Sequence, residues 1–198
     1  MIAGAILTQA AAWRNVELAL DNLLSAGIDG WPEIHALPVE ALAELVRPSG
    51  YFNAKARKLK AFAAHVCERY GGSLDDMFAA DTETVRGELL GIYGIGPETA
   101  DDILVYAAGK PSFVIDAYTI RILKRVGHSP MERDNYQGWQ ALFHANLPAD
   151  VSLFNEFHAL LDHHHKAACT KNAPRCHGCC LLDICAHGSS SIQGSPVL

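Results

Sequence analysis

The 198-residue chain is long enough for one or two folded domains, and its 49% hydrophobic and 19% charged residues are typical of a globular protein. Sixteen Lys and Arg residues against 22 Asp and Glu residues give a formal net charge of −6. This balance argues against a protein that coats nucleic acid through a generally basic surface, and it leaves room only for a local basic strip. No apolar run approaches the roughly 20 residues of a membrane helix, and no cleavable signal precedes the fold. We therefore expect a cytoplasmic protein in a reducing compartment, with no membrane partner.

Apolar residues recur with helical spacing through almost the whole chain, and no segment alternates with period two, so the sequence predicts an all-α fold. The expected helices, separated by short Gly, Pro and Asp segments, cover residues 2–9, 13–26, 39–46, 53–70, 82–90, 97–108, 118–126, 135–145 and 152–166. The helix from residue 53 places Lys55, Arg57 and Lys58 in its exposed first turns, which makes it a candidate basic edge. The Gly- and Ser-rich tail, residues 188–198, is expected to be disordered.

A glycine-rich hairpin joins the helices at 82–90 and 97–108. Gly91, Gly94 and Gly96 permit a positive φ or a close backbone approach, and Pro97 suits the first turn of the following helix. Free N–H groups at a helix start can hold an anion, and the anion expected over a hairpin without bulky side chains is a DNA phosphate. The alternative is a tight helix–helix corner in which the glycines serve only packing.

Five of the six cysteines lie between Cys169 and Cys185, whereas Cys67 stands alone. Such crowding near one end of a chain indicates a metal centre rather than a disulfide scaffold. Cys169, Cys176, Cys179 and Cys185 suit a [4Fe–4S] cluster, because a zinc ribbon would show two CxxC pairs and this segment has one clear pair. Spacing alone leaves Cys180 as an alternative to Cys179.

Several segments together resemble the endonuclease III-like, helix-hairpin-helix DNA glycosylase superfamily. They span almost the whole chain, and the cysteine spacing agrees with the iron–sulfur loop of that family and favours Cys179 over Cys180. The other matching segments are Ala5-Ile-Leu-Thr-Gln9, Gly50-Tyr-Phe-Asn53-Ala-Lys55-Ala56, Gly94-Ile-Gly-Pro-Glu-Thr-Ala-Asp101, Val114-Ile-Asp-Ala-Tyr118 and His158-Ala-Leu-Leu-Asp-His-His-His165. The pattern is similar to the 3-methyladenine glycosylase branch of this superfamily. Like this sequence, that branch lacks the lysine that other members carry just after the last glycine of the hairpin.

The resemblance implies that Asp116 is the catalytic carboxylate. Breaking an N-glycosidic bond develops positive charge on the deoxyribose, and a carboxylate beside the anomeric carbon stabilises that charge. By position alone, Asp116 would be read as the N-cap of the next helix, and the two roles are compatible. Glu98 occupies the position where bifunctional relatives carry the lysine that forms a Schiff base, so a monofunctional enzyme is implied. As an alternative, Glu98 only complements the helix dipole.

The resemblance also implies a DNA-contact set and a base pocket. The expected DNA contacts are Gln9, Lys55, Gly91, Gly94, Gly96 and Thr99. Gln9 would fill the gap left by the flipped base, although a glutamine at a helix end is more often solvent-facing. Trp13 and Tyr118 are the expected pocket residues, because an electron-rich ring can select a cationic alkylated purine. Trp13 could instead pack on the first helix pair.

For domain organisation, the resemblance implies a helical domain at residues 10–125, with the helix-hairpin-helix at about 85–108, and a second helical domain from residues 1–9 and 126–187, with the cluster loop at 169–185. The sequence begins almost at the Leu-Thr-Gln motif, whereas the family usually begins one helix earlier, so we expect either a misassigned start or a trimmed variant that has lost this helix. The prediction is therefore a monomeric enzyme that excises a damaged, alkylated base from duplex DNA. A non-catalytic DNA-binding iron–sulfur module, and a bifunctional lyase that uses Lys110 or Lys124, are the alternatives.

Overall fold

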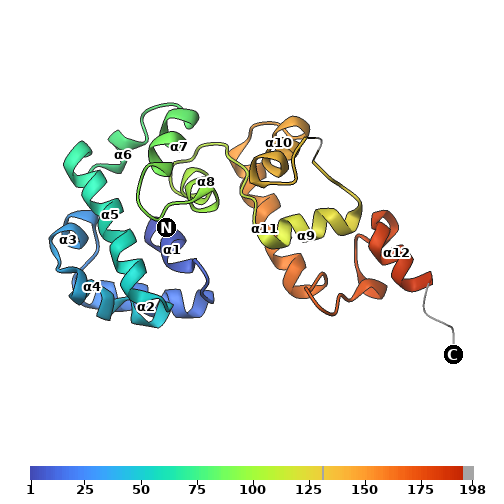
Figure 1. The fold of residues 1–198 in the computed structure, drawn as a ribbon, viewed down its shortest axis with the longest axis horizontal. Helices are drawn as coiled ribbons and strands as arrows, with labels where there is room; N and C mark the ends of the chain where they lie inside the picture. The colour runs from blue at the N-terminus through green and yellow to red at the C-terminus, as the bar shows by residue number, and fades with distance from the viewer. Residues whose placement is uncertain (131, 194–198) are drawn as a thin grey trace. The chain divides into compact units, whose positions relative to one another are not determined.

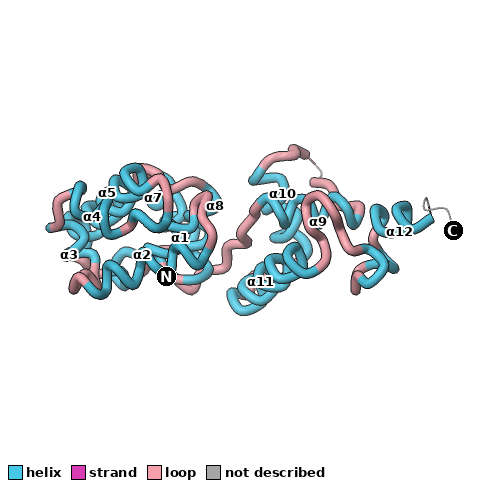
Figure 2. The backbone as a smooth tube through the Cα atoms, turned by 90° about the horizontal axis from the view of Figure 1, so that it is seen from below, coloured by secondary structure: helices cyan, strands magenta, loops and turns pink. Residues whose placement is uncertain are grey.

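A computed structural model describes residues 1–130 and 132–193, and within these residues the chain forms helices and loops without strands (Figures 1 and 2). This confirms the all-α prediction. The α-helices are α1 (Ile2–Thr8), α2 (Trp13–Ser25), α3 (Trp31–Ala36), α4 (Val39–Leu45), α5 (Phe52–Tyr70), α6 (Leu74–Met77), α7 (Thr82–Leu90), α8 (Pro97–Tyr106), α9 (Ala117–Val126), α10 (Tyr136–Asn146), α11 (Val151–Ala167) and α12 (Ala186–Gln193). Three short 3₁₀ turns are η1 (Arg47–Ser49), η2 (Cys176–Gly178) and η3 (Leu182–Ile184).

Side-chain caps explain where many of these helices begin. Five N-cap residues accept a hydrogen bond from the backbone N–H three positions later, which satisfies a group that the helix itself leaves unpaired. They are Ser73, Asp81, Asp116, Asn135 and Asp150. At the other end, α5 and α9 stop at glycines with positive φ, Gly71 and Gly127.

The structure adds three helices that the hydrophobic pattern did not predict. Two of them, α3 and α6, are too short to show a helical period in the sequence. The third, α12, begins at Ala186 and covers residues that were expected to be disordered. It packs against α9, and the N–H of Ser189 donates to the Cys185 carbonyl. Disorder is thus corrected for residues 188–193, while 194–198 lie outside the described residues.

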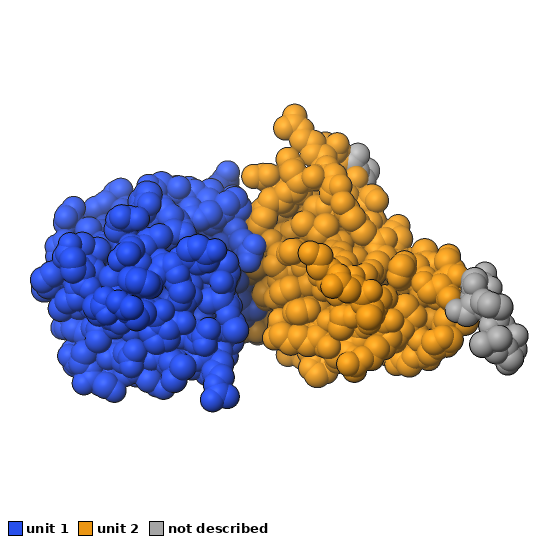
Figure 3. Space-filling view, turned by 60° about the horizontal axis from the view of Figure 1, so that its bottom comes forward, with its two compact units in different colours: residues 1–110 blue, residues 111–198 orange. Residues whose placement is uncertain are grey.

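The chain divides into two compact units, residues 1–110 and 111–198 (Figure 3). The boundary differs from the expected one in two places, because residues 1–9 belong with the first unit and residues 111–125 with the second. The first difference has a packing reason: Ile2, Ile6 and Leu7 of α1 are buried in the core of the first unit. The second follows from Phe113, which lies in the core of the second unit.

In the first unit, α5 is the central element and is packed by α1, α3 and α4. Its buried face carries Ala56, Leu59, Phe62, Ala63 and Val66. Trp31 of α3 adds a tilted ring contact to Phe62, with a centroid distance of 4.5 Å. The hairpin between α7 and α8 is anchored in the same core by Ile92 and Ile95. The packing of these two side chains fixes the position of the hairpin backbone.

In the second unit, aromatic side chains build the core. Phe113 stacks on Phe143 at 3.7 Å and meets Phe154 and Phe157 edge-on, while Trp139 is fully buried. The segment before α9, residues 112–116, is therefore buried in the core of this unit and is not a surface loop. In the described residues, no helix is long and apolar enough to cross a bilayer.

Candidate functional site

The hairpin of the first unit gathers several of the residues singled out in the sequence. Gly94 has φ of +84°, so of the three hairpin glycines it is the one that needs left-handed backbone freedom. Gly96 is the N-cap of α8 and Pro97 its first residue, which leaves the first N–H groups of α8 without intrahelical partners. An open hollow beside them is lined by Gln9, Ala10, Lys58, Gly94, Ile95, Gly96, Glu98 and Thr99.

Gln9 is held on this hairpin by three hydrogen bonds. Its Nε2 donates to the Gly94 carbonyl at 3.2 Å and to the Thr99 hydroxyl at 2.8 Å, and its Oε1 accepts from the Lys58 ammonium. The next residue, Ala10, adopts a left-handed φ of 53°, a strained conformation that recurs at functional sites. Gln9 is therefore a fixed part of the hairpin surface rather than a solvent-facing side chain. Thr99 is buried at the edge of the hollow, and its hydroxyl accepts the hydrogen bond from Gln9.

Lys55 does not form the exposed basic edge that was expected. Its side chain is 2% exposed, and the ammonium donates to the carbonyls of Leu7 at 2.7 Å and Ser49 at 2.6 Å. Burial lowers the pKa of Lys55, and the charge of Lys58 lowers it further. Lys55 thus ties the end of α1 to the turn before α5. Lys55 was expected to contact DNA, and in this structure its ammonium faces the protein interior.

Lys60 likewise bonds the carbonyls of Ile34, His35 and Leu37 at the end of α3. Of the other cations on α5, Arg57 is exposed and Lys58 lies at the hairpin. Lys58 was expected only as part of a surface strip, and no local pattern indicates that it contacts Gln9.

In the second unit, Asp116 follows a buried segment, residues 112–115, that is hydrogen-bonded to α10. The carbonyl of Phe113 accepts from Gln140, the N–H of Phe113 donates to His144, and the N–H of Ile115 donates to the Tyr136 hydroxyl. These bonds satisfy an interior backbone that belongs to no helix. Asp116 follows directly and caps α9.

The Asp116 carboxylate is 7% exposed and is held on both oxygens. Oδ1 accepts the N–H of Thr119 at 2.7 Å, and Oδ2 lies 2.9 Å from Nε2 of His158 on α11. The N-cap reading of Asp116 is thus correct as a description of its position. Capping involves only Oδ1, however, because Oδ2 contacts His158.

The two expected pocket residues lie in different units. Trp13, at the start of α2, is 53% exposed and lies over Gly4 of α1. Tyr118, in the first turn of α9, stacks on His165 at 4.3 Å and lies 6.0 Å from the His158 ring. One face of the Tyr118 ring is therefore covered by His165, whereas Trp13 is exposed.

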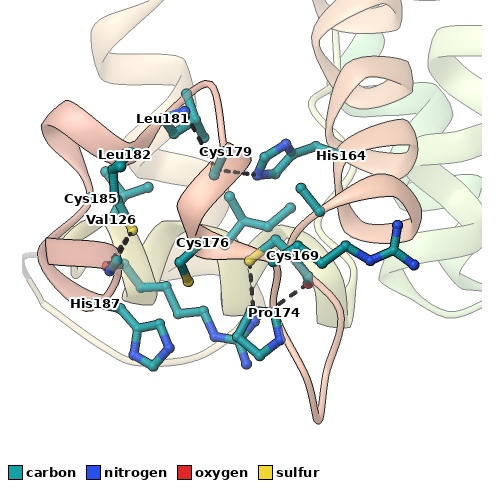
Figure 4. A pocket seen from close by; sticks show the side chains of 15 residues that line it. Val126, His164, Cys169, Pro174, Cys176, Cys179, Leu181, Leu182, Cys185 and His187 are labelled. Atoms are coloured by element: carbon teal, nitrogen blue, oxygen red, sulfur yellow. Dashed lines mark hydrogen bonds between the residues drawn. The ribbon is translucent and has the colours of Figure 1, made fainter. Parts of the chain in front are cut away.

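Four thiols near the C-terminus line one pocket (Figure 4). They belong to Cys169, Cys176, Cys179 and Cys185, whereas Cys180 is exposed and does not line it. Arg125 of α9 donates to Cys169 Sγ at 3.2 Å and to the Thr170 carbonyl at 2.7 Å. In the described part of the chain, no group of three or more His, Cys, Asp or Glu side chains is arranged to hold a single metal ion.

The electrostatics of this loop come from α9 and α11. Arg121 donates to the Cys169 carbonyl, and Arg125 also donates to the Lys171 carbonyl at 2.9 Å. Burial raises the pKa of the Cys179 thiol. His164 lies 3.7 Å from Cys179 Sγ, and burial lowers its pKa (Figure 4). Both arginines therefore face the cysteine loop.

These features are those of a known repair family, and the sequence comparison agrees. The model of the HhH-GPD superfamily of base excision DNA repair proteins matches residues 3–143. The chain belongs to this superfamily. MJ1434 of Methanocaldococcus jannaschii, provisionally named as a DNA repair glycosylase, is 40% identical to it over 93% of this chain and 84% of its own length. Endonuclease III of Bacillus subtilis is 26% identical over 77% of this chain and 65% of its own length.

Solved structures show the same fold. A DNA complex of endonuclease III has a TM-score of 0.81 and covers 97% of this chain and 84% of its own, at 21% identity. The 3-methyladenine DNA glycosylase MagIII of H. pylori, solved with 1,N6-ethenoadenine, has a TM-score of 0.71 and 30% identity, and covers 83% of each chain. The HhH-GPD protein thus has the endonuclease III-like fold, and it is a base-excision repair DNA glycosylase.

Proposed function

We propose that this glycosylase is monofunctional and hydrolyses the N-glycosidic bond of an alkylated base with Asp116 as the catalytic carboxylate. The observation that carries the proposal is the buried Asp116 at the start of α9, bonded on both oxygens. A carboxylate held in one orientation in a partly dry site stabilises the positive charge that develops on the sugar far better than a mobile one in water. It can also orient or deprotonate the attacking water.

The hairpin is proposed to bind DNA through its backbone. The start of α8 offers N–H groups and the positive end of the helix dipole to a phosphate, and the Lys58 side chain, which packs against Gly94, lies beside them. Gln9 is proposed to fill the gap left by the flipped base. To do so it must exchange its bonds to Gly94 and Thr99 for bonds to the orphaned base, which makes it a pre-positioned group.

Glu98 supports a glycosylase without strand cleavage. A carboxylate cannot form the Schiff base that a lysine forms with the sugar. The two lysines named as alternatives have other partners: Lys110 donates to the Ala80 carbonyl at 2.6 Å, and Lys124 pairs with Asp134 at 2.5 Å. These contacts favour hydrolysis of the base alone.

The substrate class is proposed to be alkylated purines. Such bases are cationic or strongly polarised and leave readily, so an aromatic face can select them with little acid catalysis. Trp13 and Tyr118 offer such faces, and MagIII, which is 30% identical, is named for 3-methyladenine. We expect the enzyme to act as a monomer on duplex DNA, in the cytoplasm where that DNA lies.

The four-cysteine pocket fits a [4Fe–4S] cluster. All four cysteines line it, Arg125 lies against Cys169 to offset thiolate charge, and no carboxylate lines the pocket. Cys169, Cys176, Cys179 and Cys185 would hold the cluster. When bound, the cluster would join η2 and the segments that follow α11, η2 and η3 through these cysteines, and it would stabilise the loop.

The test uses duplexes that each carry one lesion, including 3-methyladenine, hypoxanthine, an oxidised pyrimidine and thymine opposite guanine, with and without an alkali chase. The wild type should release an alkylated base and leave strands that break only after alkali. Asp116→Asn should lose base release by at least about 100-fold, within the usual range for a catalytic acid–base group, and keep DNA binding.

Asp150→Asn is the matched control, since Asp150 caps α11 through the N–H of Leu153 in the same way. Asn caps a helix as well as Asp does, so both variants should fold and only Asp116→Asn should lose activity. If the wild type releases no base from any duplex yet binds DNA, the chain is a DNA-binding module instead. Borohydride trapping of the protein on DNA would show a bifunctional lyase.

A further inference from the structure

His158 is the second partner of the Asp116 carboxylate. Its Nε2 lies 2.9 Å from Oδ2, across a separation of 42 residues in the sequence. We propose that His158 is a positioning residue that holds the proton of this contact and so keeps Asp116 an oriented carboxylate. The inference rests on the proposed function of Asp116 and adds to it a residue to which no role was assigned from the sequence.

The hydrogen bonding of Asp116 determines which partner should carry the proton. Two electronegative atoms 2.9 Å apart share one proton, which can sit on the imidazole nitrogen or on the carboxyl oxygen. Oδ1 already accepts the N–H of Thr119 at 2.7 Å, and the N-terminus of α9 favours negative charge at this place. Both influences stabilise the ionised carboxylate. His158 is then the donor, through an Nε2–H group.

The protonation state matters for the chemistry. A neutral carboxylic acid offers little to a developing positive charge on the sugar, whereas a carboxylate attracts it. A second fixed donor also restricts rotation of the carboxylate about its own bond, and a misplacement of about 1 Å at a reacting group can cost on the order of 100-fold in rate. His158 therefore contributes orientation and charge without touching the substrate.

The fold holds the His158 ring by more than its contact with Asp116. His158 is 9% exposed and lies on the face of α11 that also buries Phe154 and Leu161. α11 packs on α9, and the ring lies 6.0 Å from that of Tyr118 at an interplanar angle of 27°. The pair is thus built into the core of the second unit, so Nε2 cannot leave Oδ2 by a simple side-chain rotation into solvent.

A purely structural role is the competing explanation. The contact would then only secure α11 to the start of α9, and any variant that kept the fold would keep the activity. A positioning role makes a different prediction, because it depends on a donor at one place. Gln can bring an N–H donor near the position of Nε2, whereas Leu fills similar volume without one.

The experiment compares His158→Gln and His158→Leu with the wild type on DNA methylated by dimethyl sulfate, with released 3-methyladenine counted under single-turnover conditions. Binding is measured separately on a duplex with an abasic-site analogue. We expect His158→Leu to lower the single-turnover rate about 10- to 100-fold, with DNA affinity within about threefold of the wild type, and His158→Gln to recover most of the rate. Equal rates in all three folded proteins would overturn the proposal, as would equal loss in both variants.

His163→Leu and His163→Gln are the matched controls, because His163 lies on the same helix and is exposed. Both should keep the rate and the DNA affinity of the wild type. Thermal unfolding midpoints of all variants establish that each is folded. A His163 variant that lost as much rate as His158→Leu would show a general effect of changing α11 and would count against the proposal.

Nitrogen-15 NMR of the histidine rings in the wild type provides a test that requires no activity and no variant. The ring nitrogens distinguish the two neutral tautomers and the charged ring. A proton on Nε2 of His158 supports the proposal. A neutral ring with its proton on Nδ1 overturns it, because Asp116 would then be the donor. If the wild type released no base, the proposed function would fail, and the NMR result would still decide the state of the pair.

Discussion

At the scale of single residues, the same side chain takes different roles according to what surrounds it. Lys55 and Lys58 stand three positions apart on α5, yet Lys55 bonds two buried carbonyls and Lys58 bonds Gln9 at the hairpin. A buried ammonium can be stable when its donors are paired, and Lys55 makes two such hydrogen bonds. Charge counted along the sequence therefore overestimates the cations that face DNA.

Glu88 is a partly buried charge, and its environment predicts a pH dependence of stability. The carboxylate accepts from the Tyr70 hydroxyl at 2.7 Å and from His65 at 2.7 Å, with Arg69 at 3.3 Å. Burial raises the pKa of Glu88, but these hydrogen bonds and the charge of Arg69 outweigh burial, so its pKa lies below the ordinary 4.5. The group thus stabilises the fold above about pH 4.5, and this contribution is lost as the pH falls through the lowered pKa.

The measurement is urea unfolding of the wild type and Glu88→Gln at several pH values from 7 to 3. The free energy of unfolding of the wild type should fall more steeply below pH 5 than that of Glu88→Gln, because only the wild type must protonate this carboxylate. Two curves that run parallel over the whole range would contradict the assignment. Glu44→Gln is the control, since Glu44 pairs with Arg47 on an exposed surface and should change the slope little.

At the scale of elements, the hairpin combines a buried anchor with an exposed backbone. Ile92 and Ile95 fix it in the core of the first unit, and Gly94 lies between them with φ of +84°. A Cβ on Gly94 would come within 2.3 Å of Cγ of Lys58, so the Lys58 side chain lies directly over this glycine. Backbone conformation and packing therefore both require glycine here.

Gly94→Ala should destabilise the protein by about 1–3 kcal/mol, the usual cost of holding a side chain in a strained backbone region. It should also weaken DNA binding, because Lys58 must leave Gln9. Gly87→Ala is the matched control: Gly87 lies within α7, a Cβ there would meet nothing within 4 Å, and the change should stabilise the helix by about 0.5–1 kcal/mol. Urea unfolding and DNA titration check both variants, and a Gly94→Ala protein as stable as Gly87→Ala would refute the argument.

The element α9 serves two sites with its two ends. Its start carries Asp116 and Tyr118, and its last turns carry Arg121 and Arg125, which hold the loop of Cys169. Because a helix turns every 3.6 residues, Arg121 and Arg125 share one face and reach the same loop. The sequence spacing predicts that the two arginines share a face of α9. It does not predict that the loop of Cys169 packs on that face.

At the scale of the whole molecule, the net charge of −6 describes the chain and not its DNA-binding surface. Many of its cations are already paired inside the fold, as Arg86 is with the buried Asp101. Binding to DNA would then depend on a few groups around the hairpin. The two units also differ in what stabilises them, since the large hydrophobic cluster lies in the first unit and the four-thiol pocket in the second.

This difference predicts a selective effect of removing one thiol. Cys176→Ser should lose the visible absorbance of the cluster and speed amide hydrogen exchange in α9, α11 and α12, while α1–α8 keep the protection of the wild type. Cys180→Ser is the control, because Cys180 is exposed and does not line the pocket. It should keep both absorbance and protection. Exchange that rose equally in all helices of Cys176→Ser, or loss of absorbance in Cys180→Ser, would contradict the proposed ligand set.

Local pattern was enough to predict the helical class, most helices, the hairpin and the cysteine loop. The boundary at residues 110 and 111, the burial of Lys55 and the helix α12 were not predicted. The hydrophobic period and the capping residues involve only a few neighbouring positions, so the helices they define can be predicted from the sequence alone. Burial depends on which distant segments pack together, as Leu7 and Ser49 do around Lys55.

The sequence by itself determined the chemistry that this glycosylase has available: a carboxylate before a helix, a glycine hairpin, four spaced thiols and no lysine at Glu98. Only the tertiary structure decided how those groups are held. It placed His158 against Asp116 and Lys58 against Gln9, and it turned Arg125 to Cys169. The physical reason is that covalent order sets identity and local conformation, whereas a hydrogen bond between residues tens of positions apart exists only once packing has brought them together.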